Sequence, residues 1–286
     1  MSLIKICYKH INSLSGLRSL SIFDSVVKSK GQKNGTQLSK VKFWDEIYQS
    51  KSSQTEWYLN SNKASQVVKR IINDKCMLHP DRMNIVLEIG CGTAPLTIPL
   101  IKTLRKVKSP HLVIGVVTDC SPSCIDTLKK QYSSDPKFHK IRPVFRDDLD
   151  LDISHDKTSL RSLTPIMQGV MCQILDVQDI EGLHRKLQYF PVTDPEFYQH
   201  QVGPDNLFET NIIVVDKGCL DALIWDGNME DVGRVFRNCN SIVSISGEDP
   251  ESRLEYFQRS FGKLFSVHFI DGTDIFAYSY SHEIIL

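Results

Sequence analysis

Residues 84–96, NIVLEIGCGTAPL, decide the fold of this chain. They begin with a short apolar run, the pattern of a strand that is buried on both faces of a parallel sheet. Gly90 and Gly92 interrupt the run, and an apolar pattern that fits a helix resumes at Leu96. A strand that leads through a glycine turn into a helix places backbone N–H groups and a positive helix end beside a ligand. The stretch therefore predicts a ligand-binding loop in an α/β sheet.

The same stretch resembles motif I of the class I S-adenosyl-L-methionine (SAM) methyltransferases, in which an apolar run, an acidic residue and an apolar residue precede Gly-x-Gly. The resemblance implies that Glu88 contacts the methionine end of SAM. It also implies that Gly90, Cys91 and Gly92 let the cofactor pass close to the backbone. A carboxylate in a buried strand needs such a partner, because its desolvation is costly. An ordinary glycine turn and a dinucleotide site stay open as alternatives, although the loop lacks the third glycine of the dinucleotide fingerprint.

Length and charge limit the function classes. The 286 residues suffice for one large α/β domain with insertions, or less readily for two small domains. The 34 Lys and Arg residues balance 34 Asp and Glu residues, which predicts no nucleic-acid partner and no attraction to an anionic membrane. No apolar run approaches the roughly 18 residues that a membrane helix needs, so we expect no membrane insertion.

The eight cysteines are scattered, without a Cys-x-x-Cys pair or zinc-type spacing. This pattern favours a reducing compartment and predicts no metal site. We interpret Cys120 and Cys124 as packing residues, because a free cysteine in an apolar stretch behaves as a small hydrophobe. The aspartates of residues 147–152 are interleaved with leucine and lack the glycine and terminal glutamate of a calcium loop, so we expect a solvated insertion there.

The first residues, MSLIKICYKHINSLSGLRSLSIFD, contain Lys5, Lys9 and Arg18 but no acidic residue before Asp24. Leucine and isoleucine recur between serines at spacings that fit a basic amphipathic helix. This is the composition of a mitochondrial transit peptide, with an untargeted basic tail as the alternative. We therefore expect residues 1–40 to form a transit segment and linker for the mitochondrial matrix, with the cytoplasm as the alternative, and residues 41–286 to form the folded domain.

Apolar patterning predicts an N-terminal cap of two amphipathic helices, over residues 41–48 and 64–72. Phe43 and Trp44 are interpreted as packing residues of this cap. Polar segments at about 133–164 and 184–208 are predicted insertions.

Seven strands are predicted, at residues 85–89, 111–117, 170–175, 211–215, 241–246, 264–270 and 275–280. The last two flank the turn Asp271-Gly272, which predicts a hairpin and not a further βα unit. This ending separates the pattern from Rossmann dehydrogenases. The predicted fold is α/β, a seven-stranded Rossmann-like SAM methyltransferase sandwich, mostly parallel with a C-terminal antiparallel hairpin.

Acidic residues follow three of these strands, and ligands of open parallel sheets bind outside the carboxyl ends of the strands. Asp119 follows the second strand, where a carboxylate can accept hydrogen bonds from both ribose hydroxyls of a nucleoside. A capping role is the alternative for Asp119. Ser121 suits the N-cap of the next helix, with Pro122 as its first residue, and is a further candidate cofactor contact.

Asp176 and Val177 follow the third strand, where SAM methyltransferases place the adenine ring. There a carboxylate can accept the exocyclic amine, and an apolar neighbour covers the ring face. Asp216 follows the fourth strand, the position of the acceptor in methyltransferases, which makes it a candidate for the mouth of the active site. The alternative for Asp216 is a helix cap, with Gly218 easing a tight turn.

Several motifs together resemble the methyltransferase-like protein lysine methyltransferases, which include enzymes acting on elongation factor 1A. These motifs are FWDEIY, EWYLN, EIGCG, the DCSP step and DKGCLDAL. The family usually has Asp-Lys-Gly-Thr-x-Asp-Ala after the fourth strand, and here Cys219 replaces the threonine, which loses one hydroxyl. The segments ISGEDPESRLEYF and DIFAYSY are similar to those of mitochondrial methyltransferases that modify a lysine of citrate synthase.

The resemblance implies methyl transfer from SAM to the ε-nitrogen of a protein lysine by in-line displacement, which leaves S-adenosyl-L-homocysteine. The acceptor amine must be neutral, and deprotonating a free lysine near pH 7.4 costs about 4 kcal/mol. A desolvated aromatic channel lowers this cost, and Trp57 and Tyr58 are the candidates for lining it. Asp216 is expected to orient the amine or hold the cofactor, because a carboxylate is a poor general base for an amine.

The sequence therefore predicts a protein-lysine N-methyltransferase that uses SAM and modifies a protein substrate, citrate synthase, in mitochondria. A cytosolic methyltransferase for elongation factor 1A or for a small molecule is the alternative. A non-catalytic SAM-binding module is a third hypothesis, which the intact glycines and acidic positions disfavour.

Overall fold

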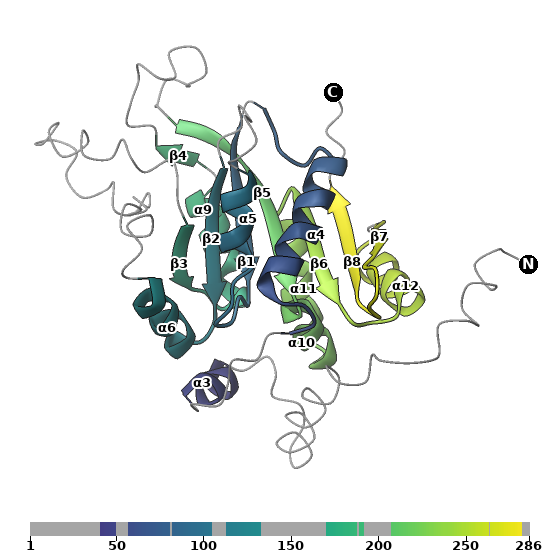
Figure 1. Cartoon of the computed structure of the whole chain (residues 1–286), viewed down its shortest axis with the longest axis horizontal. Coiled ribbons are helices and arrows are strands. Elements are labelled where there is room, and N and C mark those ends of the chain that lie inside the picture. Colours follow the sequence, from purple (N-terminus) through teal and green to yellow (C-terminus); the bar gives the residue numbers. More distant parts are fainter. Residues whose placement is uncertain are drawn as a thin grey trace, which may run out of the picture.

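The computed structural model describes residues 41–49, 57–80, 82–104, 113–132, 170–187, 189–191, 207–262 and 264–281. Within these residues, one sheet has the strand order β3-β2-β1-β5-β6-β8-β7, and the short β4 pairs with β5 (Figure 1). The strands are β1 (Met83–Ile89), β2 (Val113–Asp119), β3 (Val170–Ile174), β4 (Tyr189–Pro191), β5 (Leu207–Lys217), β6 (Ser241–Ser246), β7 (Ser266–Phe269) and β8 (Phe276–Ser281).

Strand direction follows the predicted pattern. β1 runs parallel to β2 and β5, β2 parallel to β3, and β5 parallel to β6. β8 is antiparallel to both β6 and β7, so the chain ends the sheet with a hairpin. The predicted α/β sheet, mostly parallel with a C-terminal antiparallel hairpin, is confirmed, with β4 as an additional strand.

Helices cover both faces of the sheet (Figure 1). One core contains residues of α4 (Ser61–Asp74), α5 (Thr97–Leu104) and α6 (Pro122–Tyr132). The other contains residues of α9 (Ile180–Leu187), α10 (Cys219–Trp225), α11 (Met229–Arg237) and α12 (Pro250–Phe261). Strand β1 serves both cores, because successive side chains point to opposite faces: Val86 enters the first, and Ile85 and Leu87 enter the second.

Local signals explain where several helices begin. The side chain of Asn60 accepts the N–H of Lys63 at the start of α4. The side chain of Asp249 accepts the N–H of Ser252 at the start of α12, and Pro250 follows the cap. The two helices predicted over residues 41–48 and 64–72 correspond to α3 (Val41–Gln49) and α4.

Differences from the prediction concentrate around β5. This strand begins at Leu207, and its first residues pair with β4, a contact between segments that no local pattern reveals. Helices α9 and α10 were also not predicted. The predicted transit segment, the first predicted insertion and most of the second predicted insertion lie outside the described residues. Among the described residues, no helix has the length and apolar character that a membrane span requires.

Candidate active site

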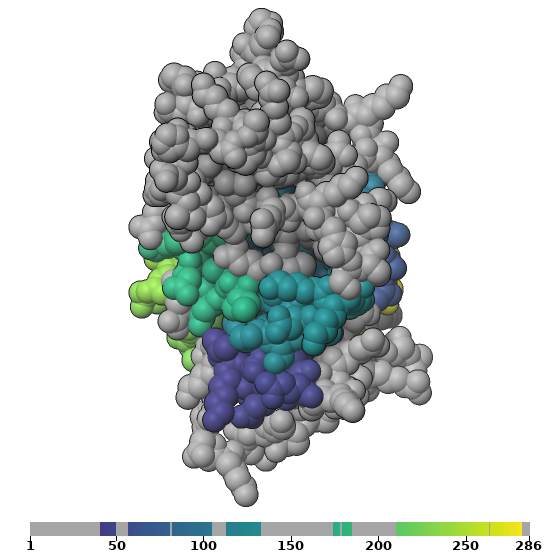
Figure 2. Space-filling model, turned by 90° about the vertical axis from the view of Figure 1, so that its left-hand side faces the viewer, coloured from purple at the N-terminus to yellow at the C-terminus, as the bar shows by residue number. Residues whose placement is uncertain are grey.

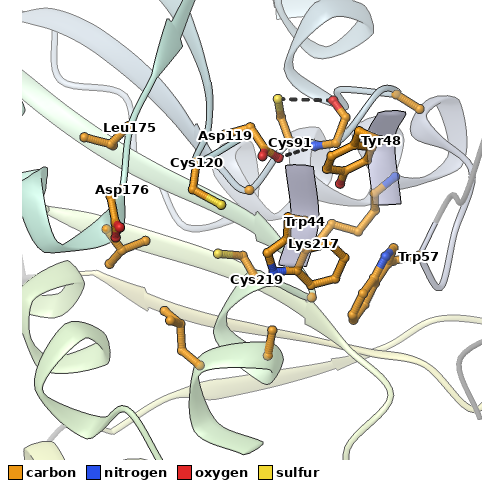
Figure 3. Close-up of a pocket in the computed structure, with 17 residues that line it drawn as sticks. Trp44, Tyr48, Trp57, Cys91, Asp119, Cys120, Leu175, Asp176, Lys217 and Cys219 are labelled. Carbon is orange, nitrogen blue, oxygen red and sulfur yellow. Dashed lines mark hydrogen bonds between the residues drawn. The ribbon is translucent and has the colours of Figure 1, made fainter. Parts of the chain in front are cut away.

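A pocket lies at the carboxyl ends of β1, β2, β3 and β5. It holds about 770 Å³ of space, part of which is open to solvent. Figure 3 shows Leu175 and Asp176 on one side of the pocket, Trp57 on the other, and Asp119 between them in the view.

The predicted site residues divide into two groups. Those that line the pocket are Trp57, Gly90, Cys91, Gly92, Asp119, Asp176 and Val177. Ligand contacts of this group stay predictions. Those that lie behind the pocket wall are Tyr58, Glu88, Ser121 and Asp216, and for each of these the structure identifies protein partners instead.

The loop after β1 needs its glycines for two reasons. Gly90 and Gly92 have φ values of 56° and 57°, a region that other residues rarely adopt. Space is also limited, because a Cβ added at Gly92 would lie 3.2 Å from Tyr48 Oη. The N–H of Gly92 donates to Asp119 Oδ2 at 3.0 Å, which ties the loop to the end of β2. The loop therefore borders the pocket without a side chain at Gly90 or Gly92.

Asp119 lines the pocket although its side chain is only 3% exposed. Oδ1 accepts the N–H of Ser121 at 2.9 Å, and Oδ2 accepts the N–H of Gly92. The Sγ of Cys124 lies within 4.8 Å of a carboxylate oxygen of Asp119. Burial raises the pKa of Asp119, and the backbone N–H groups partly offset this effect.

Glu88 lies below the loop and not in the pocket. Its side chain is buried, and its two oxygens accept the N–H groups of Leu96 at 2.9 Å and Thr97 at 2.8 Å. These groups stand at the start of α5, where a helix cannot pair its own N–H groups. Burial raises the pKa of Glu88 to about 7, against the lowering effect of the two N–H groups and of Lys217. Both oxygens of Glu88 thus have partners within the chain, and its contact with a cofactor ammonium stays a prediction.

Asp216 is also placed differently from the prediction. It is fully buried, and Oδ1 accepts the N–H groups of Cys219 at 2.7 Å and Leu220 at 3.1 Å, while Oδ2 accepts Ser244 Oγ at 2.6 Å. The alternative hypothesis of a helix cap describes this arrangement. Successive strand residues point to opposite faces, so Lys217, and not Asp216, reaches the pocket.

Ser121 forms the predicted cap of α6, because its Oγ accepts the N–H of Cys124 at 3.2 Å. The same Oγ donates to Asp45 Oδ1 at 2.7 Å, and this oxygen also accepts the N–H of Ser123 at 3.0 Å. Asp45 belongs to α3, so a carboxylate from a second helix completes the cap. These hydrogen bonds lower the pKa of Asp45. Figure 2 shows the result, with α3 in purple directly against α6 in teal.

Trp44, Tyr48 and Trp57 form an aromatic wall along the pocket. The ring centroids of Trp44 and Trp57 are 5.5 Å apart, and those of Trp44 and Tyr48 are 6.2 Å apart. Trp44 is therefore a pocket residue, which corrects its interpretation as a packing residue. Trp57 lies close to the backbone of Gly218, where an added Cβ would be 2.6 Å from Trp57 Cε3.

Tyr58 belongs to a buried polar network and does not line the pocket. Its hydroxyl donates to Asp221 Oδ2 at 2.6 Å. Asp221 is fully buried, forms an ion pair with Arg253 and accepts Ser246 Oγ at 3.0 Å. Tyr58 has a positive φ of 60°, which is uncommon for a residue other than glycine. The network holds this strained backbone next to Trp57.

Sequence reasoning missed several pocket residues: Trp44, Tyr48, Ala94, Cys120, Leu175, Lys217, Gly218, Cys219, Ala222 and Leu223. Many of them adjoin predicted residues or lie in the DKGCLDAL segment. Strand alternation would have singled out Lys217, whose Nζ donates to the carbonyl of Leu59 at 3.2 Å.

No family model matches the chain, and no curated protein matches it. Solved structures with a similar fold include methyltransferases. A proposed SAM-dependent methyltransferase from Methanococcus maripaludis is 14% identical over 89% of this chain and 99% of that chain, with a TM-score of 0.40. An rRNA methyltransferase from Streptomyces viridochromogenes is 10% identical over 82% and 89%, with a TM-score of 0.43. The human methyltransferase 10 domain containing protein is 10% identical over 77% and 82%, with a TM-score of 0.39. At these sequence identities and TM-scores, the ligand of the pocket has to be inferred from the side chains that line it.

Proposed function

We propose that this pocket binds SAM and that the protein transfers a methyl group to the ε-nitrogen of a lysine in a protein substrate. One observation carries the proposal. Carboxylates, a glycine loop and an aromatic wall line a single pocket, with Asp176 on one side, Trp57 on the other and Asp119 between them in the view (Figure 3). A nucleoside, a methionine chain and an acceptor amine require groups of these three kinds.

The residues present fit the cofactor. Asp176 and the buried side chains of Leu175 and Val177 suit an adenine ring, because they combine a hydrogen-bond acceptor with apolar cover. Asp119 is fixed by two backbone N–H groups and suits the ribose hydroxyls. The loop from Gly90 to Gly92 leaves room for the methionine chain, because no side chain of either glycine projects into the pocket.

Bound there, SAM would supply a methyl group that a sulfonium already activates, so the chain has to place and desolvate the acceptor. A lysine amine must lose its proton first, at a cost of about 4 kcal/mol near pH 7.4. The aromatic wall of Trp44, Tyr48 and Trp57 excludes water and favours the neutral amine. Asp216 supports this arrangement indirectly, because its oxygens hold the start of α10.

Lysine is proposed as the acceptor from the resemblance of DKGCLDAL to the lysine methyltransferases. Citrate synthase is proposed as the substrate from the segments ISGEDPESRLEYF and DIFAYSY. The mitochondrial matrix is proposed from the basic, serine-rich composition of residues 1–24. A reporter fused to residues 1–40 tests the location directly, because a diffuse cytosolic signal would contradict it.

Cofactor binding is tested by isothermal titration of SAM into the wild type and two variants. Asp119→Ala should abolish measurable binding, because the ribose hydroxyls lose their acceptor. Asp126→Ala is the matched control, since Asp126 is an exposed aspartate of α6, and its affinity should equal that of the wild type. Unchanged affinity in Asp119→Ala would refute the proposed cofactor site.

The acceptor is tested with methyl-labelled SAM and separate mitochondrial and cytosolic extracts. The proposal expects one labelled mitochondrial band of the size of citrate synthase, and methyllysine after hydrolysis of that band. Label only in a cytosolic protein would favour elongation factor 1A. Label that ribonuclease removes, or that appears only in small molecules, would contradict a protein acceptor.

A further inference from the structure

Three metal-binding side chains converge beside the glycine loop. The Sγ atoms of Cys91 and Cys124 and a carboxylate oxygen of Asp119 all lie within 4.8 Å of one another. The three side chains are buried, with exposed fractions of 4%, 0% and 3% in the order Cys91, Cys124, Asp119. They come from the loop after β1, the first turn of α6 and the end of β2. We propose that these residues form a binding site for a thiophilic divalent cation, Zn²⁺.

The spacing of the donors suits tetrahedral Zn²⁺. With Zn–S bonds of about 2.3 Å, two sulfur ligands of a tetrahedral ion lie roughly 3.8 Å apart. Donors that already lie within 4.8 Å reach this separation by movements of less than about 1 Å each. Two thiolates and a carboxylate are also ligand types that zinc accepts.

Hydrogen bonds hold the carboxylate of Asp119 and the backbone of both cysteines in the structure without metal. The carboxylate of Asp119 accepts N–H groups from Gly92 and Ser121. The N–H of Cys124 donates to Ser121 Oγ, and the N–H of Cys91 donates to the carbonyl of Thr118 at 2.9 Å. Such outer contacts orient metal ligands and raise affinity.

Burial disfavours ionised thiols in the cluster when no metal is bound, but it does not disfavour zinc binding in the same way. The empty cluster carries one negative charge, on Asp119, when both thiols are protonated. Zn²⁺ binding releases two thiol protons to solvent and forms two Zn–S bonds. The two positive charges of the ion therefore replace the two positive charges of the protons. The net charge of the buried cluster stays at one negative charge, and no extra charge has to be desolvated.

The remaining zinc position would face the pocket, because Cys91 and Asp119 line it while Cys124 lies behind them. Figure 3 shows Cys91 and Asp119 next to each other at the pocket wall. Zinc on Asp119 would occupy the carboxylate that we assign to the ribose hydroxyls. This second step rests on the proposed function and predicts that zinc and SAM weaken each other's binding by equal factors.

Cys124→Ala tests the site, with Cys239→Ala as the matched control, because Cys239 is a buried cysteine in the other core. Cd²⁺ serves as the probe, since its thiolate bonds give an ultraviolet charge-transfer band, and a reductant is present throughout. The wild type and Cys239→Ala should bind Cd²⁺ with the same affinity. Cys124→Ala should bind it more than about 100-fold more weakly, because even outer-shell partners of a metal are worth about 10- to 100-fold each. Equal affinity in Cys124→Ala would overturn the proposal.

A second measurement uses only the wild type, so it tests the site even if the Cys124→Ala chain fails to fold. Zn²⁺ titrations in two buffers of different ionisation enthalpy give the number of protons released. Two protons for each zinc ion support the site, and a value near zero overturns it. The metal titrations contain no SAM, so absence of SAM binding would contradict the proposed function and leave this result unaffected. With SAM binding established, a SAM affinity that zinc does not change would overturn the proposed competition.

Discussion

The backbone of Gly90 packs directly against the side chain of Cys219. A Cβ built on Gly90 would lie 2.6 Å from the Cβ of Cys219 and 2.8 Å from its Sγ. Gly90 belongs to the loop after β1, and Cys219 begins α10 after β5. The loop assigned to the cofactor and the segment assigned to the acceptor side are thus in van der Waals contact. A change in one is expected to disturb the other.

Gly90→Ala should destabilise the fold through this contact. The alanine would have to adopt a positive φ, at a cost of about 1–2 kcal/mol, and would overpack against Cys219, at a further cost of about 1–3 kcal/mol. Adding Cys219→Gly should recover the overpacking part only. Urea unfolding of the two single variants and the double variant measures this coupling.

Gly182→Ala is the control for that series. Gly182 lies in α9 with no atom within 4 Å of an added Cβ, so alanine should stabilise the helix by about 0.5–1 kcal/mol. Additive effects of Gly90→Ala and Cys219→Gly would contradict the contact.

Asp45→Ala should loosen α3 from α6 and weaken ligand binding. The substitution removes the acceptor of Ser121 Oγ and of the Ser123 N–H, a loss comparable to that of a helix cap, about 1 kcal/mol. Since α3 also contributes Trp44 and Tyr48 to the aromatic wall, SAM affinity should fall together with stability. Glu46→Ala changes the exposed neighbour on the same helix and should leave both unchanged. An Asp45→Ala chain with wild-type affinity would show that α3 does not shape the pocket.

The titration of Glu88 should lower the free energy of unfolding as the pH rises from about 4.5 to 7. Its pKa is about 7 in the folded chain, against 4.5 as the ordinary value. Below this window both states hold the proton; within it the folded state keeps a proton that the unfolded state has lost. Stability is therefore lost with rising pH, by about 3 kcal/mol across the whole window.

Glu88→Gln supplies the reference for this effect, because its amide does not titrate. Unfolding free energies of both chains, measured from pH 4 to 8, give a difference that isolates Glu88. A difference that grows in favour of the wild type with rising pH would contradict the raised pKa.

Local sequence was sufficient for most of the strands and not for the side-chain partners. The apolar run of β1 and the Ser121–Pro122 cap are properties of neighbouring residues, and both were predicted correctly. The role of Asp216 depends on which face of β5 it occupies, and the place of Trp44 depends on how α3 packs against α6. β4 likewise forms only by pairing with a distant part of the chain. These features are set by tertiary contacts, which sequence spacing does not encode.

Tyr58→Phe should weaken the acceptor side of the site while sparing the cofactor side. The hydroxyl of Tyr58 donates to Asp221, a buried carboxylate whose loss of a donor should cost about 1–3 kcal/mol. The strained backbone at Tyr58 would also lose the bond that holds it, and Trp57 would become less well fixed. We expect a higher KM for the protein substrate and an unchanged Kd for SAM, from steady-state kinetics and calorimetry. In an Asp221→Asn background, Tyr58→Phe should lower the free energy of unfolding by a smaller amount, because no carboxylate then loses its donor. An equal loss of unfolding free energy in both backgrounds would show that the Tyr58 hydroxyl acts through some other partner.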